Sequence, residues 1–408
     1  MTSRIGWIDF SREHRDRVFS VIDMLGESGT VDELGVGAVR DALADWLFPG
    51  ISTIQTRPKY FLLLPRLIQD YVAAYKEKVK VPPLTQWLRE KEHALMHELA
   101  ANYDYEDNNG VIGINVARND GELARRASSI YWNGIRIHGI VDTHYSLNDY
   151  LRANDLSTIV KGRKDEHERD DPDQFEELEG FGLHLPKFEQ PEGELLLDLT
   201  VAEADFLSAK FRDDDAESKR HENLLRQLVL VPEFARYARE ASDFPTFAEL
   251  LLADERLPEK SRYILQLALD FSFLIHSAHI RYNCCLQKQS GTTDFDEDWE
   301  AWSEDFLERR SHFAGFDLDF LFHFVAPRTK RFTQTFIRHW YNTLMEEDID
   351  LAVLDSLVRN QEIINKGEKA KLTARSGEYS GWVGLEGINY RFPRVREIFR
   401  DIYNASNA

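Results

Sequence analysis

The stretch PKYFLLLPRLIQDYVAAYKEKV, residues 58–79, shows the pattern that decides the fold of this chain. Apolar residues recur every three or four positions, which is the period of an amphipathic helix. Pro58 fits the first helical turn, where a backbone N–H has no partner inside the helix. Pro65 either kinks the helix or starts it afresh. The stretch therefore predicts a helix that buries one face in a core.

The same helical period recurs along most of the chain. Ser11 and Thr200 are suitable N-cap residues, and Thr30 followed by Glu33 forms a capping-box pattern. We predict a predominantly α, multi-helix fold. The segments with the clearest helical pattern, besides the one quoted above, are 10–25, 29–48, 83–104, 200–211, 258–287, 292–310 and 330–346.

Three regions interrupt the helical pattern. Glycines and β-branched residues predict small irregular or β segments around a brief helix near 103–140, and glycines and aromatics predict another such segment near 375–392. Residues 161–195 are rich in Asp, Glu, Gly and Pro, which is typical of a solvated linker. We therefore predict two helical halves: an N-terminal domain over 1–160, an acidic linker over 161–195 and a C-terminal domain over 196–408.

Composition limits the environment and the partners. The 408 residues include 71 acidic and 50 basic side chains, giving a net charge of -21. Such a chain repels a nucleic-acid backbone at long range, so any binding needs a local basic patch. The two cysteines, Cys284 and Cys285, are adjacent and cannot easily form an ordinary disulfide. We expect a reduced, cytoplasmic protein. The apolar stretch at 263–280 contains polar residues, and we expect it to be a buried helix without membrane contact.

Two sets of possible metal ligands occur. His93 and His97 are four residues apart on an expected helix, a spacing that can hold zinc, but Ala94 stands where zinc peptidases have glutamate. The second set lies in the apolar stretch and beyond it, and consists of His276, His279, Cys284 and Cys285. In both places the alternative is packed side chains without a metal, which we favour, and we predict no cofactor.

No catalytic signature is present. The chain contains neither Gly-Lys-Ser nor Gly-Lys-Thr, so a phosphate-binding loop of the Walker type is absent, and no Gly-x-Ser-x-Gly elbow occurs. Carboxylates could still converge from distant segments around a divalent ion. A metal-dependent nuclease therefore stays open as an alternative to a binding protein.

Local clusters of cations point to phosphate contacts. The stretch at 48–65 gathers hydroxyls with two cations before an expected helix start, where backbone N–H groups favour anions. The alternative for every cluster is ordinary ion pairing with the many carboxylates. The residues that we nominate for nucleic-acid or phosphate binding are Thr56, Arg57, Lys59, Arg136, Arg328, Lys330 and Arg331.

Several segments together resemble the uncharacterised bacterial family DUF6361. The segments that carry the resemblance are GWIDFSREHRDRV (6–18), GTVDELGVGAVRDALADWLFPGISTIQTRPKYFLLLP (29–65), SSIYWNGIRIHGI (128–140), LDLTVAEADFL (197–207) and RSGEYSGWVGLEGINYRF (375–392). The resemblance implies a place in multigene bacterial defence loci, beside helicases and phospholipase-D-like nucleases. It supplies no catalytic residues.

These observations lead to an expected function. We expect a non-catalytic accessory subunit of an anti-phage defence complex, with a helicase or nuclease from the same locus as its protein partner and DNA as a further candidate partner. Besides the nuclease, a second alternative is an acidic nucleic-acid mimic that uses the carboxylates at 165–179.

Overall fold

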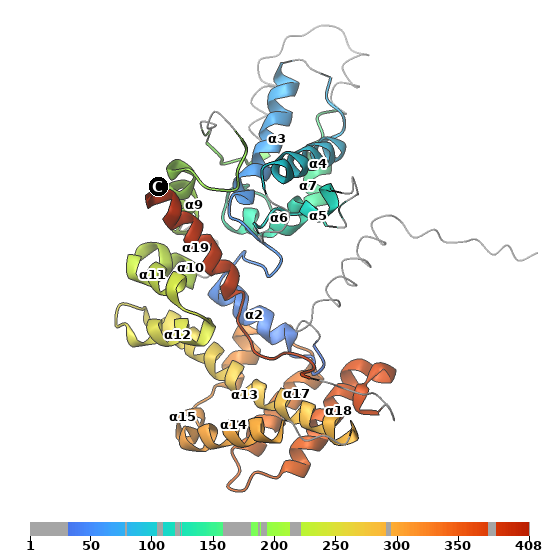
Figure 1. Ribbon diagram of the computed structural model, residues 1–408, viewed down its shortest axis with the longest axis vertical. Helices are drawn as coiled ribbons and strands as arrows, with labels where there is room; N and C mark the ends of the chain where they lie inside the picture. Colours follow the sequence, from blue (N-terminus) through green and yellow to red (C-terminus); the bar gives the residue numbers. More distant parts are fainter. Residues whose placement is uncertain are drawn as a thin grey trace, which may run out of the picture. The chain divides into compact units, whose positions relative to one another are not determined.

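The structure is a computed structural model, and Figure 1 shows its helices, with labels on most of the α-helices. It describes residues 32–77, 80–103, 109–118, 123, 125–157, 181–186, 188, 194–212, 222–290, 295–373 and 381–407. The predominantly α fold is confirmed, since these residues form helices and loops, with a single isolated antiparallel bridge between Val141 and Leu183. The helix expected over 10–25 with Ser11, the capping residue Thr30 and the carboxylates at 165–179 lie outside the described residues.

The chain divides into two compact units, each built from two separate segments. Unit 1 consists of the described residues of Met1–Leu47 and Ala241–Tyr390. Unit 2 consists of those of Phe48–Glu240 and Arg391–Ala408. The chain therefore leaves unit 1 after Leu47, builds most of unit 2, returns to unit 1 at Ala241, and ends in unit 2 from Arg391.

Unit 2 contains the helix that decided the fold prediction, and Pro65 lies inside that helix without ending it. Helix α3 packs against α4 and α6, and the last helix, α19, packs against α9 and α11. The helices of this unit are α3 (Tyr60–Lys76), α4 (Leu84–Ala101), α5 (Ile114–Ala117), α6 (Ala127–Ile137), α7 (Leu147–Ala153), α9 (Val201–Arg212), α10 (Leu224–Leu230), α11 (Pro232–Glu240) and α19 (Phe392–Asn407).

The region near 103–140 was expected to contain short strands or irregular structure around a brief helix, and its described regular elements are helices. Its described residues form α5, α6 and loops, and contain no strand. Gly134, one of the glycines of this region, allows close packing inside α6: a Cβ added there would lie 2.5 Å from the carbonyl oxygen of Gly50 and 2.6 Å from a ring carbon of Phe61. The described residues at 381–391 are irregular, as one of the alternatives anticipated.

Unit 1 is arranged around the long helix α13, which packs against five other helices of the unit, α2, α12, α14, α17 and α18. Its elements are α2 (Gly37–Leu47), α12 (Phe244–Ala253), α13 (Glu259–Ser290), α14 (Asp296–Glu308), α15 (Arg310–Phe313), α16 (Leu318–Phe320), the π-helical turn η2 (Leu321–Val325), α17 (Arg331–Leu344), α18 (Leu351–Lys366), η3 (Gly367–Lys369) and η4 (Lys371–Thr373).

Helix α13 is the one described helix whose length and composition would also suit a membrane crossing, over Glu259–Lys288, and 61% of its apolar window is buried. The expected helix is therefore present and mostly buried within unit 1. Its polar side chains have partners inside the unit. The hydroxyl of Tyr282 donates to Glu362 at 2.7 Å, and Asn283 exchanges hydrogen bonds with the backbone of Val383 at 3.0 and 2.8 Å. These bonds fix α18 and the loop after residue 381 against α13.

The start of α2 differs from the sequence prediction. The helix expected over 29–48 begins at Gly37, because Asp32 accepts hydrogen bonds from the backbone N–H groups of Val36 (2.8 Å) and Gly37 (2.7 Å). A carboxylate at a helix N-terminus satisfies N–H groups that have no partner inside the helix. Asp32 therefore starts this helix.

Candidate nucleic-acid interface

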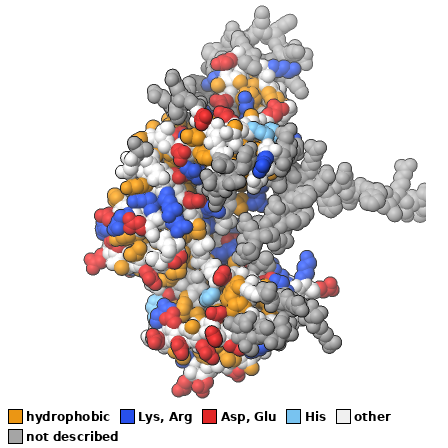
Figure 2. Space-filling model, in the orientation of Figure 1, with side chains coloured by type: hydrophobic (Ala, Val, Ile, Leu, Met, Phe, Trp, Pro, Cys, Tyr) orange, Lys and Arg blue, Asp and Glu red, His pale blue; other side chains and the backbone are white. Residues whose placement is uncertain are grey.

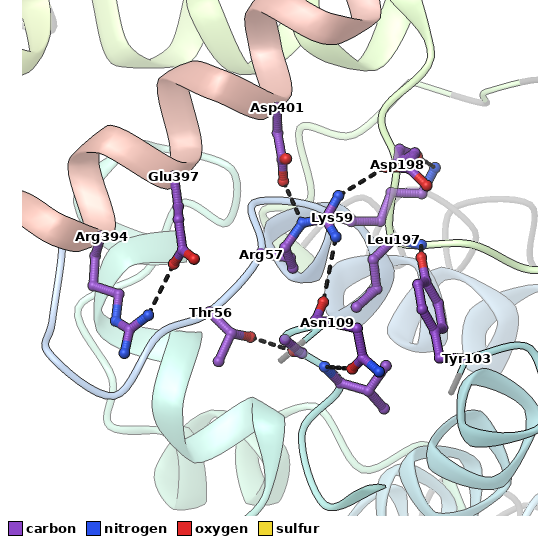
Figure 3. Close-up of polar contacts among 12 residues, drawn as sticks. Thr56, Arg57, Lys59, Tyr103, Asn109, Leu197, Asp198, Arg394, Glu397 and Asp401 are labelled. Carbon is purple, nitrogen blue, oxygen red and sulfur yellow. Dashed lines mark hydrogen bonds and ion pairs between the residues drawn. The ribbon is translucent and has the colours of Figure 1, made fainter. Parts of the chain in front are cut away.

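Arg57 joins three segments of unit 2 that are far apart in the sequence (Figure 3). Its guanidinium donates to Asp401 of α19 at 2.5 Å, to Asp198 at 2.8 Å, and to the carbonyl of Asn109 at 3.3 Å. The side chain is 16% exposed. Burial alone would lower the pKa of Arg57, but the two carboxylates outweigh burial and raise it. The charge of Arg57 is thus neutralised within the unit.

Lys59 is more deeply buried, with 5% of the residue exposed. Its ammonium donates to a carboxylate oxygen of Glu203 at 2.5 Å and to the carbonyl of Asp198 at 3.0 Å. Glu203 also accepts the backbone N–H of Thr200 at 2.8 Å, and its own N–H donates to the Thr200 hydroxyl at 3.3 Å. This reciprocal pair is a capping box, and the prediction that Thr200 caps the helix is confirmed.

Thr56 completes the segment without capping α3. Its hydroxyl donates to the carbonyl of Gly110 at 2.6 Å, and its N–H donates to the hydroxyl of Tyr131 at 2.7 Å. At the helix start, the N–H of Phe61 donates to the carbonyl of Pro58 at 3.0 Å. Because the cations and this N–H are used inside the unit, the geometry favours a structural role for the segment. Phosphate binding there stays a prediction.

Arg136 lies on α6 and holds the loop that follows this helix. Its guanidinium donates to the carbonyls of His144 at 3.0 Å and Tyr145 at 3.2 Å. Like Thr56, Arg57 and Lys59, it belongs to unit 2. The remaining three nominated cations belong to unit 1.

These three, Arg328, Lys330 and Arg331, form what we call the cationic turn. All three are exposed, and none donates a hydrogen bond or ion pair to any residue that the structure describes. The turn is held by Thr329, whose N–H and hydroxyl both donate to the carbonyl of Ala326, at 3.1 and 2.8 Å. The backbone is thus fixed while the cations face solvent.

Aromatic side chains that the sequence analysis missed precede the cationic turn. The rings of Tyr263 and Phe320 meet edge to face at 5.0 Å between centroids, and those of Phe320 and Phe324 stack at 5.4 Å and 25°. Tyr263 is 42% exposed and Phe324 is 66% exposed. We call these three side chains the aromatic ladder. The signal was visible in FDLDFLFHF, residues 316–324, where Phe320 and Phe324 are four positions apart on a helical turn.

The possible metal ligands do not form a full site. The Nε2 atoms of His93 and His97 lie 3.4 Å apart on one face of α4, and this pair supplies only two possible ligands. His279 and Cys285 are buried; burial lowers the pKa of His279 to about 4 and raises that of Cys285 to about 12. Within the described part of the chain, no three His, Cys, Asp or Glu side chains gather closely enough to hold a metal ion.

Two further buried titratable groups serve the packing of unit 2. Glu92 accepts the N–H and hydroxyl of Ser128 at 2.6 and 2.9 Å at the start of α6, and burial raises the pKa of Glu92 to about 7 despite these bonds. His138 packs between Phe61 and Phe211, and burial lowers the pKa of His138 to about 3. Neither group lies beside the cationic turn in the sequence, and both belong to unit 2.

The fold and the surface define a mainly helical protein of two compact units. Acidic and basic side chains are interspersed over the face seen in Figure 2. A family model described as "Family of unknown function (DUF6361)" matches residues 2–348, so the chain belongs to this family. Neither the curated proteins nor the solved structures contain a match. Helix α19, which carries the Arg57 partner Asp401, follows the matched range.

Proposed function

We propose that this chain is a non-catalytic accessory subunit of a bacterial anti-phage defence complex, that it binds a helicase or nuclease partner, and that it contacts DNA through the cationic turn. The defence setting and the protein partner are supported by the family resemblance. The DNA contact is supported by the surface of unit 1. The same proposal assigns a cytoplasmic location, in which the two buried cysteines stay free.

The observation that carries the DNA contact is the unpaired state of the cationic turn in an acidic chain. Elsewhere in unit 1, arginines pair with carboxylates: Arg338 with Asp319 at 2.7 Å, and Arg309 with Asp305 at 2.5 Å. With 71 acidic and 50 basic residues, an exposed cation has many carboxylates available as partners. The cationic turn has none among the described residues. Three cations within four residues, none of them paired with a described carboxylate, can contact phosphate groups; Lys330 also lies over the ring of Phe332, 5.5 Å from its centroid.

The net charge of -21 sets how such a contact behaves. Long-range repulsion slows the approach of DNA, so the contact acts at short range and weakens steeply as salt rises. Three phosphate contacts to a single strand correspond to a slope of log K against log salt of about -2.

The test is fluorescence anisotropy with labelled DNA and the full chain. Arg328→Ala/Lys330→Ala should weaken binding on the order of tenfold at about 0.1 M salt, because two phosphate contacts are lost. The matched control is Lys260→Ala/Lys369→Ala, which removes two exposed cations from the same unit and should leave the affinity unchanged. Equal loss in both double variants would contradict the assignment.

The protein partner is tested by co-expression with the genomic neighbours of the chain. The proposal predicts co-purification with a helicase or nuclease, and elution of the chain alone contradicts it. Incubating the purified chain with Mg²⁺ or Mn²⁺ and DNA completes the test, because fragments released by the isolated chain would show that it is a nuclease and not an accessory subunit.

A further inference from the structure

We infer that the aromatic ladder and the cationic turn together form a site for single-stranded DNA, in which the cations hold phosphates and unpaired bases stack on Phe324 and Tyr263. This inference rests on the proposed DNA contact and specifies its substrate. It is carried by the exposure of the ladder, its distance from the cations, and the chemistry that the two share.

Phe324 is highly exposed, although the hydrophobic effect favours burial of an aromatic ring. It is the most exposed of the large hydrophobic side chains that the structure describes, at 66%. Leaving a ring in water forfeits roughly 1.5–3 kcal/mol that burial would supply. Tyr263, at the other end of the ladder, is 42% exposed, and its hydroxyl donates to Asp317 at 3.2 Å. Two accessible rings on one short ladder form a surface suited to a flat apolar ligand.

The geometry of the ladder prepares Phe324 for stacking. Phe320 covers one face of Phe324 at 5.4 Å and 25°, and the exposure of Phe324 leaves its other face accessible. A base placed there would continue the stack. The π-helical turn η2 carries Phe324, and its end is closed by the N–H of Ala326 donating to the carbonyl of Leu321 at 2.7 Å. Single π-helical turns are frequent at functional sites because they redirect side chains.

The chain between the ladder and the cations is short. Arg328 is four positions after Phe324, so their Cα atoms lie no more than about 14 Å apart. The turn at 326–329, closed by the N–H of Thr329 donating to Ala326 at 3.1 Å, shortens this distance further. Phosphates in one strand of B-DNA advance about 3.4 Å each, so a few nucleotides bridge the gap. One strand can therefore reach the ladder and the cationic turn at the same time.

The combination favours single strands over the other anionic ligands. Bases in a duplex are paired and stacked on each other, so their faces are closed to protein rings. Unpaired bases offer those faces, and stacking on an aromatic side chain tolerates any sequence. An acidic protein segment would satisfy the cations without needing a ladder of rings. The two features together therefore match a strand with phosphates and exposed bases.

The experiment compares three labelled ligands by anisotropy in about 0.1 M salt without divalent ions: a 12-nucleotide oligo-dT, a duplex of the same length, and poly-glutamate. The full chain should bind oligo-dT most tightly. Phe324→Ala should weaken oligo-dT binding roughly 5- to 150-fold, the range for loss of one base–aromatic stack, and leave duplex binding unchanged. Phe324→Trp should keep the oligo-dT affinity. The control is Leu307→Ala, since Leu307 is another exposed apolar side chain of unit 1, at 53%.

The outcomes separate the inference from the proposed function. If oligo-dT and duplex bind equally, or Phe324→Ala leaves oligo-dT binding intact while Arg328→Ala/Lys330→Ala weakens it, the stacking site is overturned and the DNA contact stands. If poly-glutamate binds as tightly as oligo-dT, charge alone explains binding and the stacking site is again overturned. If no DNA binds, the proposed DNA contact fails as well.

Discussion

Replacing Lys59 by methionine tests whether the segment at 48–65 is a structural joint of unit 2. Lys59 and Glu203 are each about 7% exposed at the side chain and lie 2.5 Å apart. Removing the ammonium leaves the Glu203 carboxylate buried without its counter-charge. Breaking a buried pair in this way costs about 3–5 kcal/mol. In a unit of this size, each kcal/mol of lost stability lowers the melting temperature by about 2–4 °C. We therefore expect the melting temperature of unit 2 to fall by roughly 6–20 °C.

The measurements are thermal and urea unfolding followed by circular dichroism, with amide hydrogen exchange in α3 and α9 to report on unit 2. Lys59→Met/Glu203→Gln should recover much of the loss, because both charges are removed and glutamine still completes the capping box with Thr200. Arg236→Ala is the matched control. Its pair with Glu240 is exposed at 49% and 60% and should contribute no more than about 1 kcal/mol.

Lys59→Met also distinguishes the two interpretations of the segment. At a temperature where the variant stays folded, its affinity for DNA should equal that of the unchanged chain, because Lys59 is not presented to a ligand. An unchanged urea midpoint together with weaker DNA binding would refute this reasoning and restore the segment as a phosphate site.

Three other predictions concern packing and titration. Glu92→Gln keeps an acceptor for the Ser128 N–H and removes the titrating carboxyl group. Because the folded pKa of Glu92, about 7, is above its ordinary value of 4.5, the unchanged chain should lose stability relative to this variant as pH rises from 4.5 to 7. Urea midpoints measured at several pH values will show this loss. Gly134→Ala should cost about 1–3 kcal/mol or more by overpacking, whereas Gly315→Ala, with nothing within 4 Å of the added Cβ, should be tolerated in thermal melts. Cys284 and Cys285 are 3% exposed and burial raises their pKa values to about 11 and about 12, so a thiol reagent at pH 8 should react with them only after unfolding.

The sequence predicted those parts of the fold that depend on local period. The helices over α3, α4, α9, α13 and α17 follow from apolar spacing, and Thr200 was recognisable as a cap because a threonine stands at the start of the helical pattern; its partner Glu203 needed the folded structure. Helix α6 was harder to predict, because the glycine that signals a turn in a linear pattern is a close-packing residue in the folded unit. At this position, the packing contacts of Gly134 outweigh the low helix propensity of glycine.

The candidate site was predictable only in part. The cationic turn was nominated from a run of charges, but the partners of Arg57 lie 141 and 344 residues away, beyond any linear scan. Nothing in the sequence distinguishes an arginine that joins three segments from one that faces solvent. The aromatic ladder joins α13 to residues 320–324, so only its second half has a local signal. That the side chain of Phe324 is exposed could be learned only from the folded structure.

The most direct test of the DNA contact is the salt dependence of oligo-dT binding between about 0.05 and 0.3 M salt. With three phosphate contacts, the unchanged chain should give a slope of log K against log salt of about -2, and Arg328→Ala/Lys330→Ala should reduce it to about -0.7. Identical slopes for the two proteins would contradict the account, because the cationic turn would then release no counterions from DNA.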